Sequence, residues 1–223
     1  ATYFEKVQAV LKKYDVLMVA DEVICGFGRT GNMWGSQTFN IKPDLLTCAK
    51  ALSSSYLPIS AVLISDDLYT AVRDQSGELG GFSHGYTYSG HPVPAAVALE
   101  TLKIYEERDI VGHVQRVGPI MQARLREFSD HPLVGEVRGV GLLAGVEVMA
   151  DGANRLSFDP AAKVGPKVQA LCEENGLLIR AMGDSIGFCP PLIIDEGTIE
   201  KMLAQFGKSL DQALDWARQE GLV

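Results

Sequence analysis

Two oppositely charged side chains, Asp21 and Lys50, each follow a short apolar run, "VLMVA" and "DLLTCA". Ligands in open α/β sheets gather at the carboxyl ends of strands, so an acid and an amine in these places can share one crevice. Spacing alone also fits a structural ion pair, and that alternative stays open. The small and polar stretch "ALSSSYLPIS" after Lys50 leaves room for a bulky ligand and favours a binding site.

An amine and a carboxylate in one crevice suit pyridoxal phosphate. This cofactor needs an amine for a Schiff base and a carboxylate that keeps its ring nitrogen protonated, so that the ring can act as an electron sink. Lysine supplies the amine, and a buried aspartate supplies the carboxylate well because a low dielectric strengthens its attraction to the pyridinium. The residues therefore predict Lys50 and Asp21 as these two groups.

The stretch 21–31, "DEVICGFGRTG", also contains G-x-G-x-x-G, the pattern of a dinucleotide-binding turn. Such a turn needs its last glycine to open a helix that receives the pyrophosphate. Here "NMWGSQTFNIKPD" follows without a helical stripe, and Asp21 and Glu22 place negative charge where the pyrophosphate would lie. Only Asp44 is available, as a weak candidate, for the ribose-binding acid. We predict that the glycines shape a tight loop close to other backbone, with a nicotinamide-dependent oxidoreductase as the residual alternative.

Alternating strands and helices in the first half of the chain must position these residues. The elements that run length and periodicity predict are a helix at 3–14, strands at 16–20, 45–48 and 59–65, a helix from Asp66, a polar loop at 75–91, a helix from Pro92 and a helix at about 109–129. The apolar run 16–20 is expected to be a buried strand. This alternation is typical of α/β layers.

From Pro132 the pattern changes to neighbouring strands followed by helices, which is typical of an α+β domain. The elements predicted there are two strands around 139–141, a helix at about 160–175, strands in "LLIRA" and "SIGFCPPLI", and a final helix at about 195–218. We place the domain boundary after residue 107, so that the second domain, residues 108–223, begins with a linking helix.

Three segments, "LMVADEVICGFGRTG", "KPDLLTCAKALSSSYLPISAV" and "HGYTYSGHPVPAAVALETL", closely resemble the class III aminotransferases, which are pyridoxal-phosphate enzymes of fold type I. They are most similar to the ω-transaminases that exchange amines with pyruvate. The resemblance implies an α/β fold in which residues 1–107 form the later part of the cofactor-binding large domain, with a mostly parallel sheet. Residues 108–223 would form the smaller α+β C-terminal domain.

The resemblance also implies roles for five residues. Asp21 would pair with the ring nitrogen, Val23 would pack against one face of the ring, and Lys50 would form the Schiff base and then move the substrate proton. Thr87 matches the threonine that reaches the cofactor phosphate of the partner subunit, which implies a homodimer with shared active sites. Arg180 matches the mobile arginine that binds a substrate carboxylate, a role that the guanidinium fork suits.

Ile24 departs from the family pattern, because many class III enzymes carry a glutamine there that contacts the phenolic oxygen of the cofactor. This difference disfavours an ornithine or γ-aminobutyrate type and favours the amine–pyruvate branch. Tyr86 and Tyr88 are candidates either for the mouth of the pocket or for core packing. The resemblance covers the later half of a family chain, and the phosphate cradle and stacking aromatic of the family belong to the earlier half.

The expected activity is transfer of an amino group from a primary amine or ω-amino acid to a keto acid such as pyruvate. The alternatives are a non-catalytic fragment that lacks the N-terminal half of the site, an aminomutase and a decarboxylating transaminase.

Composition limits the other partners. The 223 residues carry a net charge of -8, which argues against nucleic acid or an anionic membrane as the main partner. No apolar run approaches the ~18 residues that span a bilayer. The four cysteines are isolated, which predicts reduced thiols in a cytoplasmic protein, and we predict no metal site.

Overall fold

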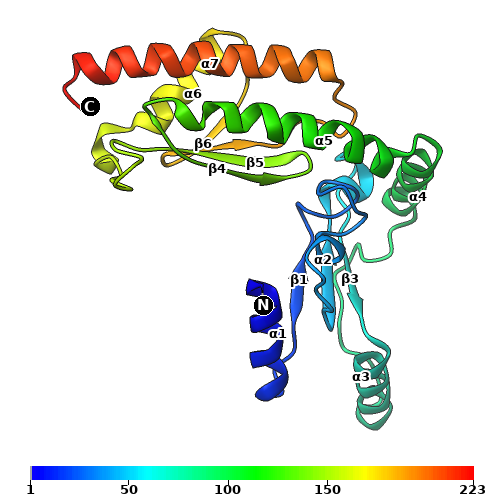
Figure 1. Ribbon diagram of the computed structural model, residues 1–223. Helices are drawn as coiled ribbons and strands as arrows, with labels where there is room; N and C mark the ends of the chain where they lie inside the picture. Colours follow the sequence, from blue (N-terminus) through cyan, green and yellow to red (C-terminus); the bar gives the residue numbers. More distant parts are fainter. Residues whose placement is uncertain (1) are drawn as a thin grey trace. The chain divides into compact units, whose positions relative to one another are not determined.

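The computed structural model describes residues 2–223, which separate into two compact units with the boundary between residues 111 and 112. Figure 1 shows the elements of both units. The division into domains after residue 107 stays a prediction.

The first unit carries a three-stranded sheet with helices before and after its strands (Figure 1). Its elements are α1 (Tyr3–Lys13), β1 (Val19–Asp21), α2 (Gly35–Thr38), β2 (Leu45–Cys48), the 3-10 helix η1 (Lys50–Ser53), β3 (Ala61–Ile64), α3 (Asp66–Leu79) and α4 (Pro92–Glu107). The strand order is β1-β2-β3, with β1 and β2 parallel and β2 and β3 antiparallel. Because β1 and β2 run parallel, their carboxyl ends lie at the same edge of the sheet.

Local capping explains where the helices of this unit begin and end. A capping box joins Thr2 and Glu5 at the start of α1, and the Ser65 side chain accepts a hydrogen bond at the start of α3. His91 caps α4, whose first residue is a proline as predicted. Gly80 ends α3 with a φ of 79°, so the polar loop begins at residue 80 and the prediction of a loop from residue 75 was wrong.

The core of the first unit lies on one face of the sheet. Phe27, Leu46, Cys48, Leu52 and Ala98 form its buried cluster. Because side chains alternate along a strand, Leu46 and Cys48 face this cluster while their neighbours in β2 face the opposite side.

The prediction of a buried strand at 16–20 was wrong in its bounds and its burial. Val16 donates its N–H to Leu11 at the end of α1, so the chain joins the sheet only after Met18. β1 is an outer strand of this sheet, and Val19 is 56% exposed. Val62 and Ile64 of β3, the other outer strand, are exposed as well.

The second unit is an antiparallel sheet covered by helices. Its elements are α5 (Ile110–Arg126, which begins in the first unit), η2 (Glu127–Asp130), β4 (Val134–Val140), β5 (Leu143–Val148), η3 (Pro160–Ala162), α6 (Val164–Glu174), β6 (Arg180–Met182), β7 (Ser185–Phe188) and α7 (Glu196–Gln219). The strand order is β4-β5-β7-β6, with every neighbouring pair antiparallel. The α+β pattern predicted from Pro132 onward is therefore present.

Helices α5, α6 and α7 lie on one side of this sheet (Figure 1). Buried and half-buried residues alternate along β5 and β7, as expected when one face packs and the other does not.

Glycines allow helices and loops of this unit to approach each other closely. A side chain at Gly118 would lie 2.9 Å from Gly141 Cα, and one at Gly165 would clash with the Gly183 carbonyl.

None of the helices within residues 2–223 combines the length and the apolar character that crossing a membrane requires.

Candidate functional site

Asp21 closes β1 and lies in parallel register with Thr47 of β2. The next backbone hydrogen bond, from Glu22 N to the Thr47 carbonyl at 2.9 Å, fixes this pairing. The Asp21 carboxylate accepts hydrogen bonds from Thr47 Oγ1 at 3.2 Å and from Val23 N at 3.1 Å. Asp21 and Val23 are thus held together at the carboxyl end of the strand, as a shared site requires.

Glu22 has a different role from its neighbour Asp21. It is only 3% exposed, and its carboxylate accepts hydrogen bonds from Gly35 N at 2.8 Å and Ser36 N at 2.6 Å. These bonds satisfy backbone donors at the start of α2 and tie the far end of the glycine-rich loop to the end of β1. Sequence reasoning treated Glu22 only as a negative charge and missed this role.

The glycines of 21–31 shape a loop, as predicted. A side chain at Gly26 would lie 2.8 Å from the Glu22 carbonyl and 2.9 Å from the Trp34 ring. Gly28 and Gly31 have φ values of 105° and 89°, which favour glycine. No helix opens at Gly31, and the only helix between β1 and β2 is the four-residue α2, so the requirement for a dinucleotide turn is not met.

Lys50 follows the adjacent strand β2 and begins η1. Its φ of 45° is unusual for a residue with a side chain and costs about 1 kcal/mol, a kind of strain that clusters at functional sites. Tyr105 in α4 donates its hydroxyl to the Ala51 carbonyl at 2.7 Å and so anchors the backbone beside Lys50. Burial raises the pKa of Tyr105, which favours the neutral, donating phenol.

Asp21 and Lys50 do not form the structural ion pair that spacing alone allowed. Both lie in the described part of the chain, and no ion pair or hydrogen bond joins their side chains. Within residues 2–223, Lys50 Nζ and Asp21 Oδ2 have no partner at all. β1 is an outer strand of the sheet within residues 2–223, and Asp21 is exposed there. The prediction that Asp21 is buried was therefore wrong for this part of the protein.

This arrangement has the donor set that pyridoxal phosphate needs: a carboxylate oxygen and an amine, both unpaired, at the ends of two adjacent parallel strands. The residues present therefore fit the cofactor's ring nitrogen and its aldehyde carbon.

Thr87 lies in a turn of the exposed loop between α3 and α4, in the same unit as Asp21 and Lys50. Its neighbours Tyr86 and Tyr88 are 77% and 80% exposed, so the alternative of core packing is wrong for the described residues. Both tyrosines line an open cavity of about 670 Å³, together with Pro58 and His91. The cavity is compatible with the predicted pocket mouth.

Arg180 is the first residue of β6 and belongs to the second unit. The strand registers place Arg138, Gly145, Gly187 and Arg180 in one row across β4, β5, β7 and β6. Arg180 is exposed and has no ion pair or side-chain hydrogen bond within residues 2–223. It is thus available to a carboxylate, as the predicted role requires.

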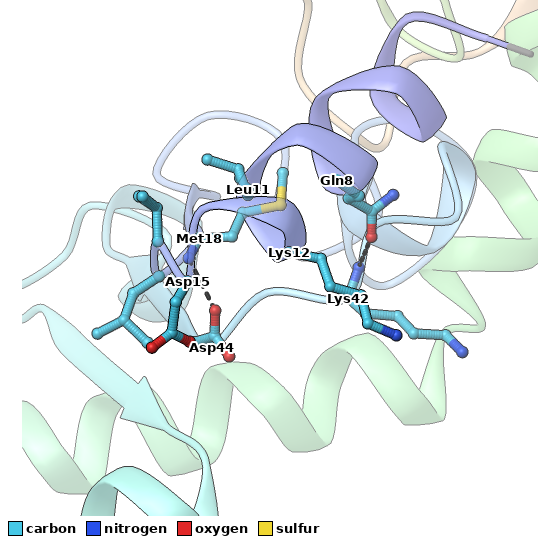
Figure 2. Close-up of a pocket in the computed structure, with 9 residues that line it drawn as sticks. Gln8, Leu11, Lys12, Asp15, Met18, Lys42 and Asp44 are labelled. Atoms are coloured by element: carbon cyan, nitrogen blue, oxygen red, sulfur yellow. Dashed lines mark hydrogen bonds between the residues drawn. The ribbon is translucent and has the colours of Figure 1, made fainter.

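A separate pocket of about 310 Å³ lies at the opposite ends of β1 and β2, between α1 and the two strands (Figure 2). Gln8, Lys12 and Lys42 line one part of it, and Asp44 accepts a hydrogen bond from Met18 N at 2.7 Å. Met18 and Asp44 directly precede β1 and β2, whereas Asp21 ends β1 and Lys50 follows β2, so this pocket is distinct from the candidate site. Asp44 therefore acts as a structural acceptor here.

Comparisons with known proteins give the family of this chain. The family model of the class III aminotransferases matches residues 1–210. "Gamma aminobutyrate transaminase 3, chloroplastic" of Solanum lycopersicum is 53% identical over 210 residues, which are 94% of this chain and 40% of that protein. An uncharacterised aminotransferase of Sinorhizobium fredii is 47% identical and is matched over 98% of this chain and 48% of its own length.

Solved structures show the same likeness. A transaminase determined with L-alanine superposes with a TM-score of 0.93 at 54% identity, over 96% of this chain and 50% of the other. The ω-transaminase of Pseudomonas jessenii in complex with PMP gives a TM-score of 0.93 at 48% identity, over 96% of this chain and 48% of the other.

The chain belongs to the class III aminotransferases and carries part of the fold type I architecture. It spans between two fifths and one half of the length of these relatives. The curated relatives with γ-aminobutyrate transaminase names do not support the prediction, drawn from Ile24, against that type.

Proposed function

We propose that the complete protein is a pyridoxal-phosphate-dependent transaminase that moves an amino group from a primary amine or ω-amino acid to a keto acid such as pyruvate. One observation carries this proposal: Asp21, with an unpaired carboxylate oxygen, ends β1, and Lys50, with an unpaired amine, follows the adjacent parallel strand β2. Membership of the class III family and the similar transaminases support it.

The bound cofactor would supply an electron sink that stabilises the carbanion at the substrate carbon. Lys50 would hold the cofactor as a Schiff base and, once released, would move the proton at that carbon. Asp21 would hold the ring nitrogen in its protonated form, and Val23 would pack against the ring. Arg180 would bind the carboxylate of substrates that have one.

The remaining predictions belong to the same proposal. Thr87 would bind the cofactor phosphate of a partner subunit, so the protein would be a homodimer with shared active sites. We also propose a cytoplasmic location, no nucleic-acid or membrane partner and no metal. The four cysteines are free thiols in the structure, which supports a reducing compartment.

Absorbance of the purified protein tests the assignment of Lys50. A Schiff base with the cofactor gives a band near the visible edge, and this band should shift when an amine donor is added. Lys50→Ala should abolish the band because, among residues 2–223, Lys50 is the lysine that follows the carboxyl end of β2 beside Asp21. Lys42→Ala is the matched control, since Lys42 is an exposed lysine at the opposite ends of the strands. A protein that gains no band with added pyridoxal phosphate would contradict the proposal.

A further inference from the structure

Thr47 is the side chain that the β1–β2 register places directly beside Asp21. Its hydroxyl has one proton to donate, and the structure directs that proton to Asp21 Oδ1 over 3.2 Å. Residues in register on neighbouring strands project from the same face of a sheet, so this contact follows from the pairing itself.

Both hydrogen bonds to Asp21 end on the same oxygen. Oδ1 accepts from Thr47 Oγ1 and from Val23 N, while Oδ2 has no partner among residues 2–223. Two donors from different directions restrict rotation of the carboxylate about its Cβ–Cγ bond. The consequence is a carboxylate with one oxygen held by the protein and the other presented outward.

The Thr47 hydroxyl is not needed for the packing of β2. Leu46 and Cys48 carry the packing of β2 against the core, and Thr47 lies on the opposite face, opposite the exposed Val62 of β3. A valine has the same branched shape and an equal or better preference for a strand. The one feature that threonine adds here is its hydrogen bond to Asp21.

We propose that Thr47 is a positioning residue for the cofactor: it holds Asp21 Oδ1, so that Oδ2 is presented to the ring nitrogen. This inference rests on the proposed function and adds Thr47 to the residues that act on the cofactor.

Two variants separate positioning from strand structure, because they remove different parts of the side chain. Thr47→Val keeps the shape and removes the hydroxyl, whereas Thr47→Ser keeps the hydroxyl and removes the methyl group. We expect Thr47→Val to bind pyridoxal phosphate about tenfold more weakly and Thr47→Ser to remain within about twofold of the unmodified protein. A purely structural role would give the reverse order, with valine equal to threonine and serine weaker.

The measurement is made on the complete protein, with the dissociation constant of pyridoxal phosphate from absorbance titration and thermal unfolding of the apoprotein as a check on folding. Cofactor labelled with ¹⁵N in its ring gives a chemical shift that reports protonation of the ring nitrogen. We expect Thr47→Val to move this shift toward that of the unprotonated ring and Thr47→Ser to restore it.

A double-mutant cycle tests whether Thr47 acts through Asp21. In an Asp21→Asn background, Thr47→Val should change cofactor affinity by less than about twofold. An unchanged ring-nitrogen shift and affinity in Thr47→Val, with normal binding by the unmodified protein, would overturn this inference alone. If the unmodified protein itself bound no cofactor, the proposed function would fail together with it.

Discussion

Arg180 and Arg138 stand at the two ends of one row across the sheet of the second unit, with only Gly187 and Gly145 between them. Arg138 is engaged: it pairs with Glu147 at 2.8 Å and donates to Ser185 Oγ at 3.1 Å. Arg180 has no such partner within residues 2–223. Two arginines on one face therefore differ in availability, and only one of them is free to bind a substrate carboxylate.

Arg180→Ala should reduce kcat/KM for carboxylate-bearing substrates by about tenfold or more, because a charge-assisted bidentate contact is lost. Simple arylalkyl amines have no carboxylate, so their kcat/KM should change little. Steady-state kinetics with one substrate of each kind makes the comparison.

Arg138→Ala is the matched control for this prediction. It removes an arginine from the same row but one whose exposed ion pairs contribute about 1 kcal/mol or less to stability. We expect no selective loss for carboxylate substrates. Equal losses for both substrate classes in Arg180→Ala would contradict the assigned role.

At the level of single residues, the sequence indicates which side chains could react with a ligand. It does not indicate as well which side chains position them. The sequence alone makes Asp21 and Lys50 candidates because each charged residue directly follows an apolar run. Thr47 and Glu22 could not be predicted, because their partners are set by strand register and by the return of the loop at Gly35, neither of which a local pattern encodes. Knowledge of the β1–β2 register would have identified Thr47.

Among the elements, helices were predicted more accurately than strands. Capping residues and Pro92 mark where the helices begin, and these are local signals. β1 was misplaced because its bounds depend on tertiary contacts: Val16 is bound to the end of α1, and Met18 to Asp44. An apolar run predicts a strand but cannot give its first paired residue.

The contact between η2 and α7 contains a histidine that makes stability depend on pH. The C-terminal end of η2 is followed by His131, whose Nδ1 accepts a hydrogen bond from Leu133 N at 3.2 Å and whose Nε2 lies 3.5 Å from Asp211 of α7. Burial lowers the pKa of His131, although Asp211 opposes this effect, and Arg218 adds to it. The folded protein therefore holds this imidazole in its neutral form more strongly than the unfolded chain does.

A lowered folded-state pKa stabilises the protein above the unfolded value of about 6.5, and this contribution is lost as the pH falls through the folded pKa. The melting temperature should therefore fall as the pH drops below about 6.5. His131→Gln should reduce this dependence, because the amide cannot titrate while its oxygen can still accept from Leu133. Exposed His84 provides the control, and His84→Gln should leave the pH dependence unchanged. An unaltered slope in His131→Gln would contradict the assignment.

At the scale of the whole molecule, the first unit leaves apolar strand surface and a long loop exposed. The outer strands of the first unit expose Val19, Val62 and Ile64, and the loop at 80–91 is exposed throughout. The chain spans between two fifths and one half of its relatives' length. Residues that other segments or a second subunit would contribute could not be predicted from these 223 residues, because the physical contacts that define them lie elsewhere.

The proposed sharing of sites between subunits can be tested by mixing two inactive variants. If Thr87 acts across a dimer interface, a heterodimer of Lys50→Ala and Thr87→Ala subunits contains one site with both changes and one site with neither. Random mixing in equal amounts should then restore about a quarter of all sites, because half of the dimers are heterodimers.

The readout is the Schiff-base absorbance at limiting cofactor concentration after the two proteins are unfolded and refolded together. If Thr87 instead served its own subunit, each site in the heterodimer would carry one change, and mixing would restore none. Each variant refolded alone gives the baseline, and a mixture that does not exceed it would contradict the shared site.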